Sequence, residues 1–362
     1  MAKLESGPVS RYFRENIAAM EGYLPGEQSR DEGTIKLNTN ENPYAPSPRV
    51  LSALTKAANR ALRLYPEPLS DSLRSIAATT YGVRSENVLA GNGSDELLSI
   101  LVRCFVGQGD QVVYPVPTYT LYDTLIAIQG GDKVTLDYLP GFALPEALYS
   151  QKAALTFLCN PNSPSGTLVS LEEIERLARS VSGVLVVDEA YIDFAEAKGV
   201  SSISLLKSFS NLVVLRSFSK SFSLAGMRIG LAFAAEEVIK GMIKVKDSYN
   251  LNRLSLVAAT AALQDLPWML RNVRRIQRSR RRLTLGLRKM GFQVYPSQAN
   301  FVMGRKKGQN LRGLYEELKR RKILVRYFDQ SGLEDSLRIT VGTPQEVKML
   351  LKEMEAILTN HT

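Results

Sequence analysis

Between about residues 70 and 230, short apolar runs alternate with segments of helical periodicity. Runs such as "GVLVVD" and "NLVVL" have the length and composition of buried strands, and "SLEEIERLARS", just before the first of them, has apolar residues at helical spacing. This alternation is typical of βαβ units, whose strands lie parallel in one sheet with helices on both faces. The pattern therefore predicts an α/β fold.

Each predicted strand can be matched to a helix or a polar loop that follows it. "ENVLAGNGSDELLSILVRCF" predicts a strand, a glycine-rich turn and a helix that opens at Ser94. Ser170 and Glu173 are spaced as a helical capping box. A further helix is predicted in "PLSDSLRSIAATTYG", and further strands in "DQVVYPV", "AALTFLCN" and "NLVVLRS".

The last part of the chain has a different order of elements. After residue 290 the pattern is strand, helix, strand, strand and helix, with Thr343 as the last cap and Pro344 in the first turn. The first forty residues lack clear periodicity and resemble an arm. We therefore predict a large domain over 39–276, and a small α+β domain formed by the arm, 1–38, together with 277–362.

Composition is that of an ordinary globular protein, with 362 residues, 44% of them apolar and 23% charged. Cys104 and Cys159 are too few for a disulfide framework. We see no apolar run long enough to cross a bilayer, and the N-terminal twenty residues lack the apolar core of a signal peptide. The expectation is a cytoplasmic protein with reduced cysteines.

The net charge of +10 is concentrated in residues 271–290, which carry eight arginines and one lysine. A helix that binds a nucleic-acid backbone is one interpretation. The other is a long amphipathic helix with a solvated basic face. We favour the second, and expect no nucleic-acid partner, because no aromatics interleave with the arginines and apolar residues recur at helical spacing: Val273, Ile276, Leu283, Leu287 and Met290.

The single histidine, His361, is the last residue but one of the sequence. A Ser-His-Asp or Cys-His site would have to use it. Histidine-ligated metal sites are equally disfavoured, and two cysteines cannot form a zinc cluster alone, so no metal site is expected. Proton transfer must then fall to lysine, tyrosine, aspartate or glutamate.

Polar residues follow three predicted parallel strands where a plain sheet would not need them. Asn160 and Asp188 end two of these strands, and Lys220 follows the third. In open α/β sheets, ligands bind beyond the carboxyl ends of the strands, so the three side chains could meet one bound molecule. Each could instead cap a turn, as asparagine and aspartate often do.

Two features indicate a phosphate site. "AGNGSDELL" places a glycine-rich turn before a helix, whose free N–H groups favour an anion. "SFSKSFSLAGMR" adds the Ser217 and Ser219 hydroxyls and the Arg228 guanidinium. No dinucleotide or P-loop motif is present. A phosphorylated cofactor, a lysine nucleophile and an aspartate that pairs a ring nitrogen together indicate pyridoxal 5'-phosphate (PLP).

The order of these motifs resembles the fold-type I PLP-dependent transferases, and within them the histidinol-phosphate aminotransferase branch. The likeness rests on Asn160, "DEAY" at 188–191 and "SFSKSFSLAGMRIG" at 217–230, and also on "LNTNENPY", "LYPEP" and "SLRITVG". It implies a large domain with a mainly parallel seven-stranded sheet, and a homodimer with shared active sites. It also implies amino transfer between histidinol phosphate and 2-oxoglutarate, in histidine biosynthesis.

The resemblance also implies a role for each matching residue. Lys220 would hold PLP and act as acid and base, Asp188 would bind the pyridine nitrogen, and Tyr191 would contact the ring hydroxyl. The other implied cofactor contacts are Asn160 at that hydroxyl, Tyr119 stacked on the ring, and, at the phosphate, Ser94, the backbone of Asp95, Ser217, Ser219, Arg228 and Tyr65 of the other subunit. Substrate contacts would be Arg338, Tyr23, Arg326 and Asn42.

Two departures from the family pattern loosen the substrate assignment. "NPNSPSG" has serines where many relatives carry asparagine and threonine, and "MRIGLAF" lacks a tyrosine common in this branch. We expect neither to affect the lysine, aspartate or arginine roles. An aromatic amino-acid aminotransferase and a threonine-phosphate decarboxylase, which would share these catalytic residues, stay open as alternatives.

Overall fold

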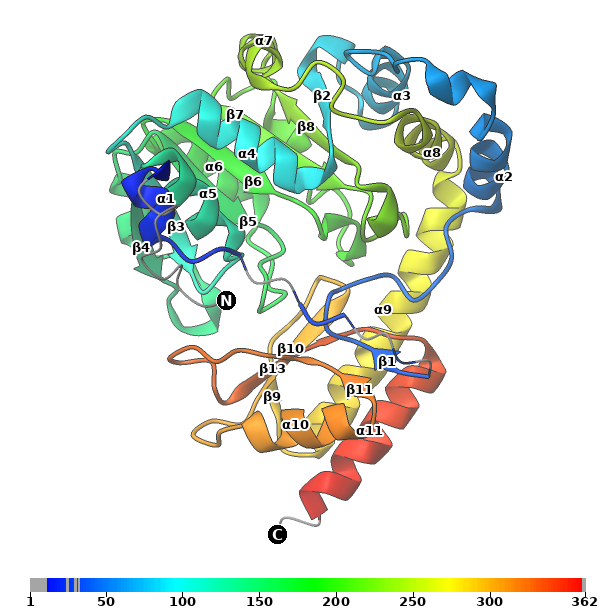
Figure 1. Ribbon diagram of the computed structural model, residues 1–362. Coiled ribbons are helices and arrows are strands. Elements are labelled where there is room, and N and C mark those ends of the chain that lie inside the picture. Colours follow the sequence, from blue (N-terminus) through cyan, green and yellow to red (C-terminus); the bar gives the residue numbers. More distant parts are fainter. Residues whose placement is uncertain (1–11, 24–25, 29–30, 32, 360–362) are drawn as a thin grey trace.

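The structure is a computed structural model that describes residues 12–23, 26–28, 31 and 33–359 (Figure 1). It has a large part built on one sheet and a small part built on another. Helix α9, Leu266–Lys289, runs from the large part down along the small part. Among the described residues, no helix combines the length and apolar character that a membrane span requires.

The large part is centred on a seven-stranded sheet in the order β2-β8-β7-β6-β5-β3-β4. All neighbouring strands are parallel except at β8, which runs antiparallel to both β2 and β7. The strands are β2 Val88–Gly91, β3 Gln111–Val116, β4 Asp132–Asp137, β5 Leu155–Cys159, β6 Val184–Asp188, β7 Leu212–Ser217 and β8 Gly230–Ala234.

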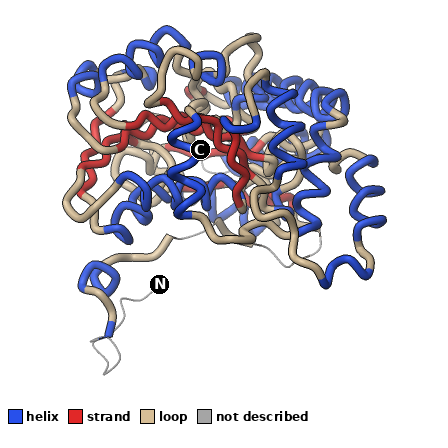
Figure 2. Tube along the Cα trace, turned by 90° about the horizontal axis from the view of Figure 1, so that it is seen from above, coloured by secondary structure: helices blue, strands red, loops and turns tan. Residues whose placement is uncertain are grey.

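Helices cover both faces of this sheet (Figure 2). One face packs against α4 (Gly93–Phe105), α5 (Leu121–Gln129) and α7 (Glu236–Val245). The other packs against α3 (Asp71–Tyr81), α6 (Leu171–Ser180) and α8 (Arg253–Leu263). In β7, Leu212 and Val214 lie in one core and Val213 and Leu215 in the other, so the run must be apolar throughout.

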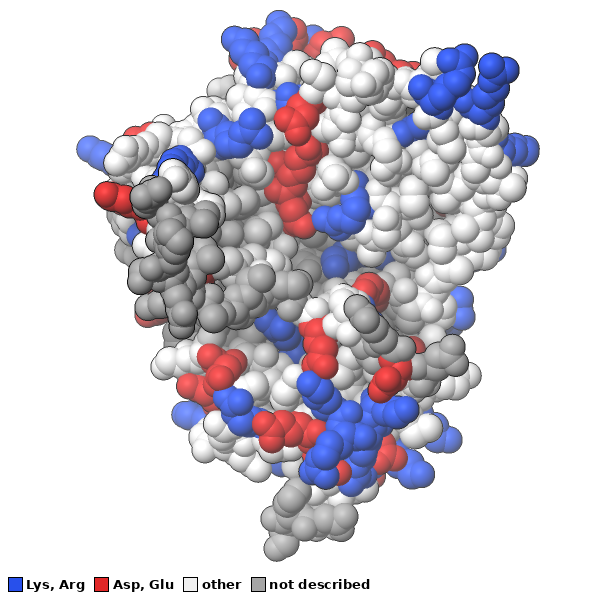
Figure 3. Space-filling model, in the orientation of Figure 1, with Lys and Arg blue, Asp and Glu red and all other residues white. Residues whose placement is uncertain are grey.

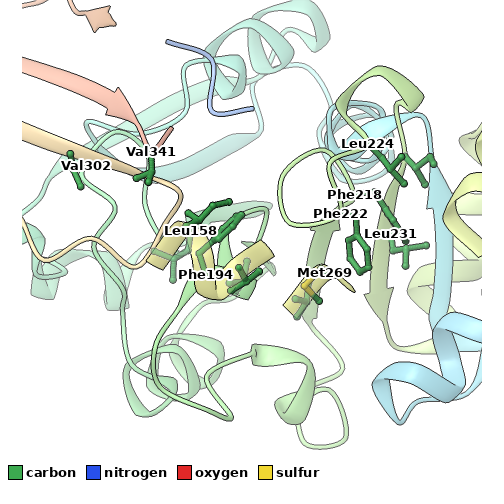
Figure 4. Close-up of a cluster of buried hydrophobic side chains, with 14 of the residues drawn as sticks. Leu158, Phe194, Phe218, Phe222, Leu224, Leu231, Met269, Val302 and Val341 are labelled. Atoms are coloured by element: carbon green, nitrogen blue, oxygen red, sulfur yellow. The ribbon is translucent and has the colours of Figure 1, made fainter. Parts of the chain in front are cut away.

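The small part contains a four-stranded antiparallel sheet in the order β12-β13-β10-β9. Its core is continuous with that of the large part, since Val302 and Val341 belong to the same buried cluster as Leu158 and Phe194 (Figure 4). Its elements are β9 Gln293–Val294, β10 Phe301–Arg305, α10 Arg312–Arg320, β11 Ile323–Leu324, β12 Arg326–Tyr327, β13 Ser336–Thr340 and α11 Pro344–Thr359.

The N-terminal segment contacts both parts. The short helix α1, Glu15–Ala19, lies against α5, where Asn16 donates to the carbonyl oxygen of Ala127 over 2.7 Å. Strand β1, Ile35–Lys36, pairs in parallel with β11 of the small part. Helix α2, Pro48–Ala57, then packs on α8. The segment between β1 and α2 is thus fixed at its two ends.

The predicted fold class and mainly parallel seven-stranded sheet are confirmed. The predicted caps are also present, because Glu173 N–H donates to Ser170 Oγ and Glu346 N–H to Thr343 Oγ1. The antiparallel β8 and helices α2 and α8 had not been predicted individually. The proposed domain boundary between residues 276 and 277 falls inside α9 and stays a prediction. The single histidine of the sequence, His361, lies outside the described residues.

Helix α9 has the predicted buried stripe, formed by Val273, Ile276, Leu283 and Leu287. Arg280 departs from the predicted solvated basic face. It is 3% exposed, donates to the carbonyl oxygens of Phe194 and Ala299, and pairs with Glu196 at 2.9 Å. On the face of the molecule seen in Figure 3, basic and acidic side chains are interspersed.

Candidate active site

A cavity of about 480 Å³ lies between the carboxyl ends of the large-sheet strands and the small part. Lys220 and Asp188 line it from the large part, and Arg326 and Arg338 line it from the small part. Figure 3 shows basic side chains at the hollow between the two parts. A larger hollow of about 1140 Å³ lies elsewhere, around Tyr81 and Arg216, and none of the predicted site residues line it.

Lys220 follows β7 and is half-buried in the cavity wall. Its Nζ donates to the carbonyl oxygen of Thr39 over 3.2 Å. Burial and the positive charge of Arg338 lower its pKa to about 8, against the attraction of Glu41 and Asp95. A substantial fraction of this amine is therefore neutral near pH 8, as a nucleophilic or proton-accepting lysine requires.

Asp188 ends β6 and is 3% exposed. Burial raises its pKa to about 6, although it accepts hydrogen bonds from the Ala190 N–H at 3.1 Å and from the Tyr122 hydroxyl at 3.3 Å. At neutral pH it is a carboxylate that faces the cavity. Such a group is suited to hold a proton on a ring nitrogen.

Two tyrosines present protonated hydroxyls to the cavity, since burial raises the pKa of both Tyr119 and Tyr191. The Tyr191 hydroxyl oxygen accepts from Asn40 Nδ2 at 3.1 Å, so its own proton points to another acceptor. Tyr119 donates to Asp95 over 3.2 Å and meets Tyr23 edge-on, with ring centroids 6.1 Å apart. Tyr119 can stack on a flat ligand while remaining anchored by its hydroxyl.

The N-terminus of α4 forms a second end of the cavity, where Ser94 and Asp95 lie beside Arg228. The first-turn N–H groups of a helix lack intrahelical partners and attract anions. A Cβ on Gly93 would lie 2.7 Å from Nη2 of Arg228, and one on Gly230 would lie 2.6 Å from the Ser94 nitrogen. Glycine is therefore needed at both positions to bring the guanidinium and the helix end together.

The small part contributes two arginines from neighbouring strands. Arg326 of β12 and Arg338 of β13 are directly opposite each other in the register of the antiparallel pair. Arg338 donates to Ser163 Oγ at 2.9 Å and to the Asn38 carbonyl oxygen at 3.0 Å, while its Nε is buried without a hydrogen-bond partner. Ser163 is one of the serines by which "NPNSPSG" departs from the family pattern, so this loop contacts Arg338 directly; that the departure leaves the arginine role intact stays a prediction.

Most predicted site residues meet at this cavity. Those that line it are Tyr23, Ser94, Asp95, Tyr119, Asp188, Tyr191, Ser217, Ser219, Lys220, Arg228, Arg326 and Arg338. Asn160 lies behind the wall, fully buried, with its amide oxygen and nitrogen bonded to the backbone of Val169. Asn42 turns toward the lysine segment, and Tyr65, which is 78% exposed, stacks on Tyr249 outside the cavity.

Several residues at the cavity were missed by the sequence analysis. Thr39, Asn40 and Glu41 enter from the segment between β1 and α2, and Tyr122 supports Asp188. Burial raises the pKa of Glu41, but hydrogen bonds from Lys36 and Thr39 lower it below the ordinary value. The motif "LNTNENPY" was the available signal, but only Asn42 had been selected from it.

The described residues fit PLP. The helix end, Arg228 and the two glycines supply a phosphate cradle, and Lys220 is a partly neutral amine. Asp188 supplies a buried carboxylate, and Tyr191 a hydroxyl proton. In the described part of the chain no cluster of histidine, cysteine, aspartate or glutamate could hold a metal ion. The fold and this site define an α/β enzyme of fold type I, with a lysine at the carboxyl end of a parallel strand.

Comparison with known proteins gives the family. Residues 32–354 match the family model "Aminotransferase class I and II". A histidinol-phosphate aminotransferase 1 of Trichormus variabilis is 44% identical over 97% of this chain and 100% of that protein, and one of Citrifermentans bemidjiense is 45% identical over 95% and 98%. The chain belongs to the class I and II aminotransferases and is a transaminase of this PLP-dependent family.

A solved structure agrees with the sequence relatives. The histidinol-phosphate aminotransferase of Sinorhizobium meliloti, in complex with PLP, superposes with a TM-score of 0.85 and 27% identity. The match covers 91% of this chain and 92% of that one. The same fold thus accommodates the cofactor in a relative whose match spans nearly all of both chains.

Proposed function

We propose that the protein transfers an amino group from histidinol phosphate to 2-oxoglutarate, with PLP held by Lys220. The relatives named above support the substrate. The observation that carries the proposal is the arginine pair Arg326 and Arg338, which lies across two strands and lines the cavity from the small part.

Like charges directly opposite on neighbouring strands destabilise a sheet. Burial lowers the pKa of Arg338, and the nearby charge of Arg326 lowers it further, so the charged form of Arg338 is disfavoured by its surroundings. The Nε of Arg338 also lacks a partner. A phosphate dianion would neutralise both guanidinium groups and accept that free N–H. In the other half of the reaction, the carboxylates of 2-oxoglutarate would occupy the same place.

The cofactor, when bound, supplies a protonated ring that accepts the electrons left at the substrate α-carbon. Asp188 holds the proton on the ring nitrogen, and Tyr191 donates to the ring hydroxyl. Arg228 and the first turn of α4 hold the phosphate. Lys220 Nζ accepts the proton from the substrate α-carbon, because it is the one titratable amine among the described residues that line the cavity.

A homodimer with shared sites belongs to the same proposal. Tyr65 lies outside the cavity of its own chain, on a surface with Tyr249 and the exposed Leu62 and Leu64. This apolar surface is suited to a second copy of the chain, which would bring Tyr65 to the partner's phosphate site. A cytoplasmic location stays a prediction of the sequence.

A half-reaction panel tests the substrate. Purified protein loaded with PLP is mixed separately with histidinol phosphate, phenylalanine, tyrosine, glutamate and threonine phosphate, without an oxo acid. We expect histidinol phosphate to convert the cofactor to its amine form fastest, as followed by absorbance. Faster conversion by phenylalanine or tyrosine would contradict histidinol phosphate as the substrate and indicate an aromatic amino-acid aminotransferase. Release of CO₂ from threonine phosphate would contradict amino transfer and indicate a decarboxylase. Lys220→Ala is the control and should not show the yellow colour of lysine-bound PLP.

A further inference from the structure

The segment Lys220–Ser221 is held from two sides by residues that do not line the cavity. On one side, Asn42 Nδ2 donates to the carbonyl oxygen of Lys220 at 2.9 Å and to that of Ser221 at 3.3 Å. The Asn42 amide oxygen accepts from the Tyr44 N–H at 3.0 Å, which fixes the amide plane. The backbone of the lysine therefore cannot shift without breaking these bonds.

On the other side, Ser221 connects the lysine segment to a buried ionic network. Its hydroxyl, in a residue 1% exposed, donates to Asp193 Oδ2 at 2.5 Å. Asp193 also accepts from Arg216, and Arg216 Nη1 lies 3.6 Å from Glu189. Glu189 is held in turn by Ser201 Oγ at 2.6 Å and the Ser202 N–H at 2.5 Å.

The network is charged and almost fully enclosed. The side chains of Arg216 and Glu189 are 8% and 0% exposed, and that of Asp193 is 17% exposed. Burial alone lowers the pKa of Arg216, but Asp193, Tyr81 and Glu189 raise it above the ordinary value, so the guanidinium stays charged. Buried ions with complete partners are geometrically well defined, because any displacement leaves a charge unpaired.

The network also spans the two strand ends that carry the site. Glu189 directly follows Asp188 at the end of β6, and Arg216 lies in β7, four residues before Lys220. We propose that Asp193, acting through Ser221, and Asn42 are positioning residues that fix the Lys220 amine relative to Asp188. The inference rests on the proposed function, in which Lys220 is the reacting amine.

This role makes a different prediction from simple stabilisation. A merely structural network would lower the stability of a variant and leave the reactivity of Lys220 in the folded fraction unchanged. A positioning network would change kcat with little change in KM, since a misplacement near 1 Å can cost about 10²-fold in rate. It would also change Lys220 in the protein without cofactor, where activity plays no part.

The test uses Ser221→Ala, which disconnects the lysine from the network and leaves the Arg216–Asp193–Glu189 contacts in place. Asn42→Ala removes the hydrogen bonds from Asn42 to the Lys220 and Ser221 carbonyl oxygens and provides a second, independent variant. Ser221→Thr restores a hydroxyl. The matched control is Asp335→Asn, because the Asp335 side chain is 12% exposed and pairs with Arg305, away from the lysine segment.

Two readouts are compared on folded protein, as checked by circular dichroism. The first is kcat and KM of the enzyme loaded with PLP. The second is the labelling of Lys220 by acetic anhydride in cofactor-free protein, followed across pH by peptide mass spectrometry. The charged groups that face the amine are Arg338, Glu41, Asp95 and Arg228, and no variant removes any of them.

For Ser221→Ala and Asn42→Ala we expect kcat to fall about 10- to 100-fold with KM within about threefold of wild type. A displaced amine is better hydrated, which favours its charged form and raises its pKa. The pH at which Lys220 becomes labelled should therefore shift upward. Ser221→Thr should recover at least part of both effects, and Asp335→Asn should show neither.

Labelling and kcat that match those of Asp335→Asn in both alanine variants would overturn the positioning role. A loss of kcat in both variants with an unchanged labelling profile would also overturn it. The failure of the proposed function would look different: wild-type Lys220 would not take up PLP, or Lys220→Ala would retain full aminotransferase activity.

Discussion

Two arginines, Arg216 and Arg338, lie on opposite sides of the lysine segment, and their surroundings differ sharply. Arg216 sits behind the segment and meets two carboxylates, those of Asp193 and Glu189. Arg338 sits in the cavity and, among the described residues, finds only neutral acceptors, while Arg326 lies across from it. The charge of Arg216 is therefore neutralised within the protein, whereas the charge of Arg338 has no carboxylate partner among the described residues.

The difference separates structural charges from functional ones. Removing one partner from a complete buried network leaves another charge unpaired, so the loss falls on the fold. Removing a cation with no carboxylate partner relieves repulsion and desolvation, so the loss falls on ligand binding. Four predictions test this contrast, in order of expected effect.

Arg216→Met should cause the largest change in stability. It would leave Glu189 and Asp193 as buried carboxylates without their cation, and the free energy of unfolding should fall by about 3–5 kcal/mol. Urea unfolding followed by circular dichroism measures this. Arg305→Met, which breaks a more exposed pair with Asp335, serves as the control and should cost about 1 kcal/mol or less. Equal losses in the two variants would contradict the contrast.

Arg338→Met should leave the free energy of unfolding within about 1 kcal/mol of wild type, because lost hydrogen bonds are offset by relief of burial and repulsion. With histidinol phosphate, kcat/KM should fall on the order of 10²- to 10³-fold, the equivalent of losing two charge-assisted hydrogen bonds. Steady-state kinetics and urea unfolding together measure the two effects. A strongly destabilised but fully active variant would reverse the assignment.

The pH dependence of cofactor uptake should follow the ionisation of the Lys220 amine. Because only the neutral amine reacts, uptake of PLP by the cofactor-free protein should rise with pH and level off above about 8, the pKa of Lys220. In Arg338→Met the midpoint should move up, since a nearby positive charge is removed. It should stay below the ordinary lysine value of 10.5, because burial is the larger cause. Stopped-flow absorbance measures the rate, and a downward shift in this variant would contradict the electrostatics.

Inorganic phosphate should give the smallest effect. In protein already loaded with PLP, phosphate at about ten times its Kd should raise Tm by about 1 to 3 °C by binding between Arg326 and Arg338. The shift should disappear in Arg338→Met. Sulfate should act similarly and chloride much less. A shift of equal size in wild type and variant would place the phosphate elsewhere.

The residues that line the cavity were predicted from the sequence better than the residues of the buried ionic network around Arg216. Lys220, Asp188 and Arg228 were expected at the site because each ends or follows a strand or stands in a loop suited to phosphate, and Arg338 was expected because "SLRITVG" resembles the carboxylate-binding strand of the family. The fold class followed from apolar runs, since a strand buried on both faces must be apolar throughout.

The buried network was not foreseen, because its members are far apart in sequence and each has an ordinary local context. Arg216 stands in "NLVVLRSFSK" and gives no local sign of meeting Asp193, 23 residues earlier. Asn42 was expected to contact substrate, and its bonds to the Lys220 and Ser221 carbonyls depend on a contact between residues 178 apart. Arg280 was expected in solvent for the same reason: periodicity assigns a residue to a helix face but does not show what else packs there.

The segment between β1 and α2 has a consequence for the timing of folding. Asn38 accepts a hydrogen bond from Arg338, and Asn40 bonds Thr340, in each case 300 residues later in the chain. At about 5–20 residues per second on the ribosome, roughly 15 to 60 s separate the synthesis of the two sides. A nascent chain can assemble the large sheet before the arginine pair exists. Acquisition of a working site must therefore be one of the last events in the biogenesis of this enzyme.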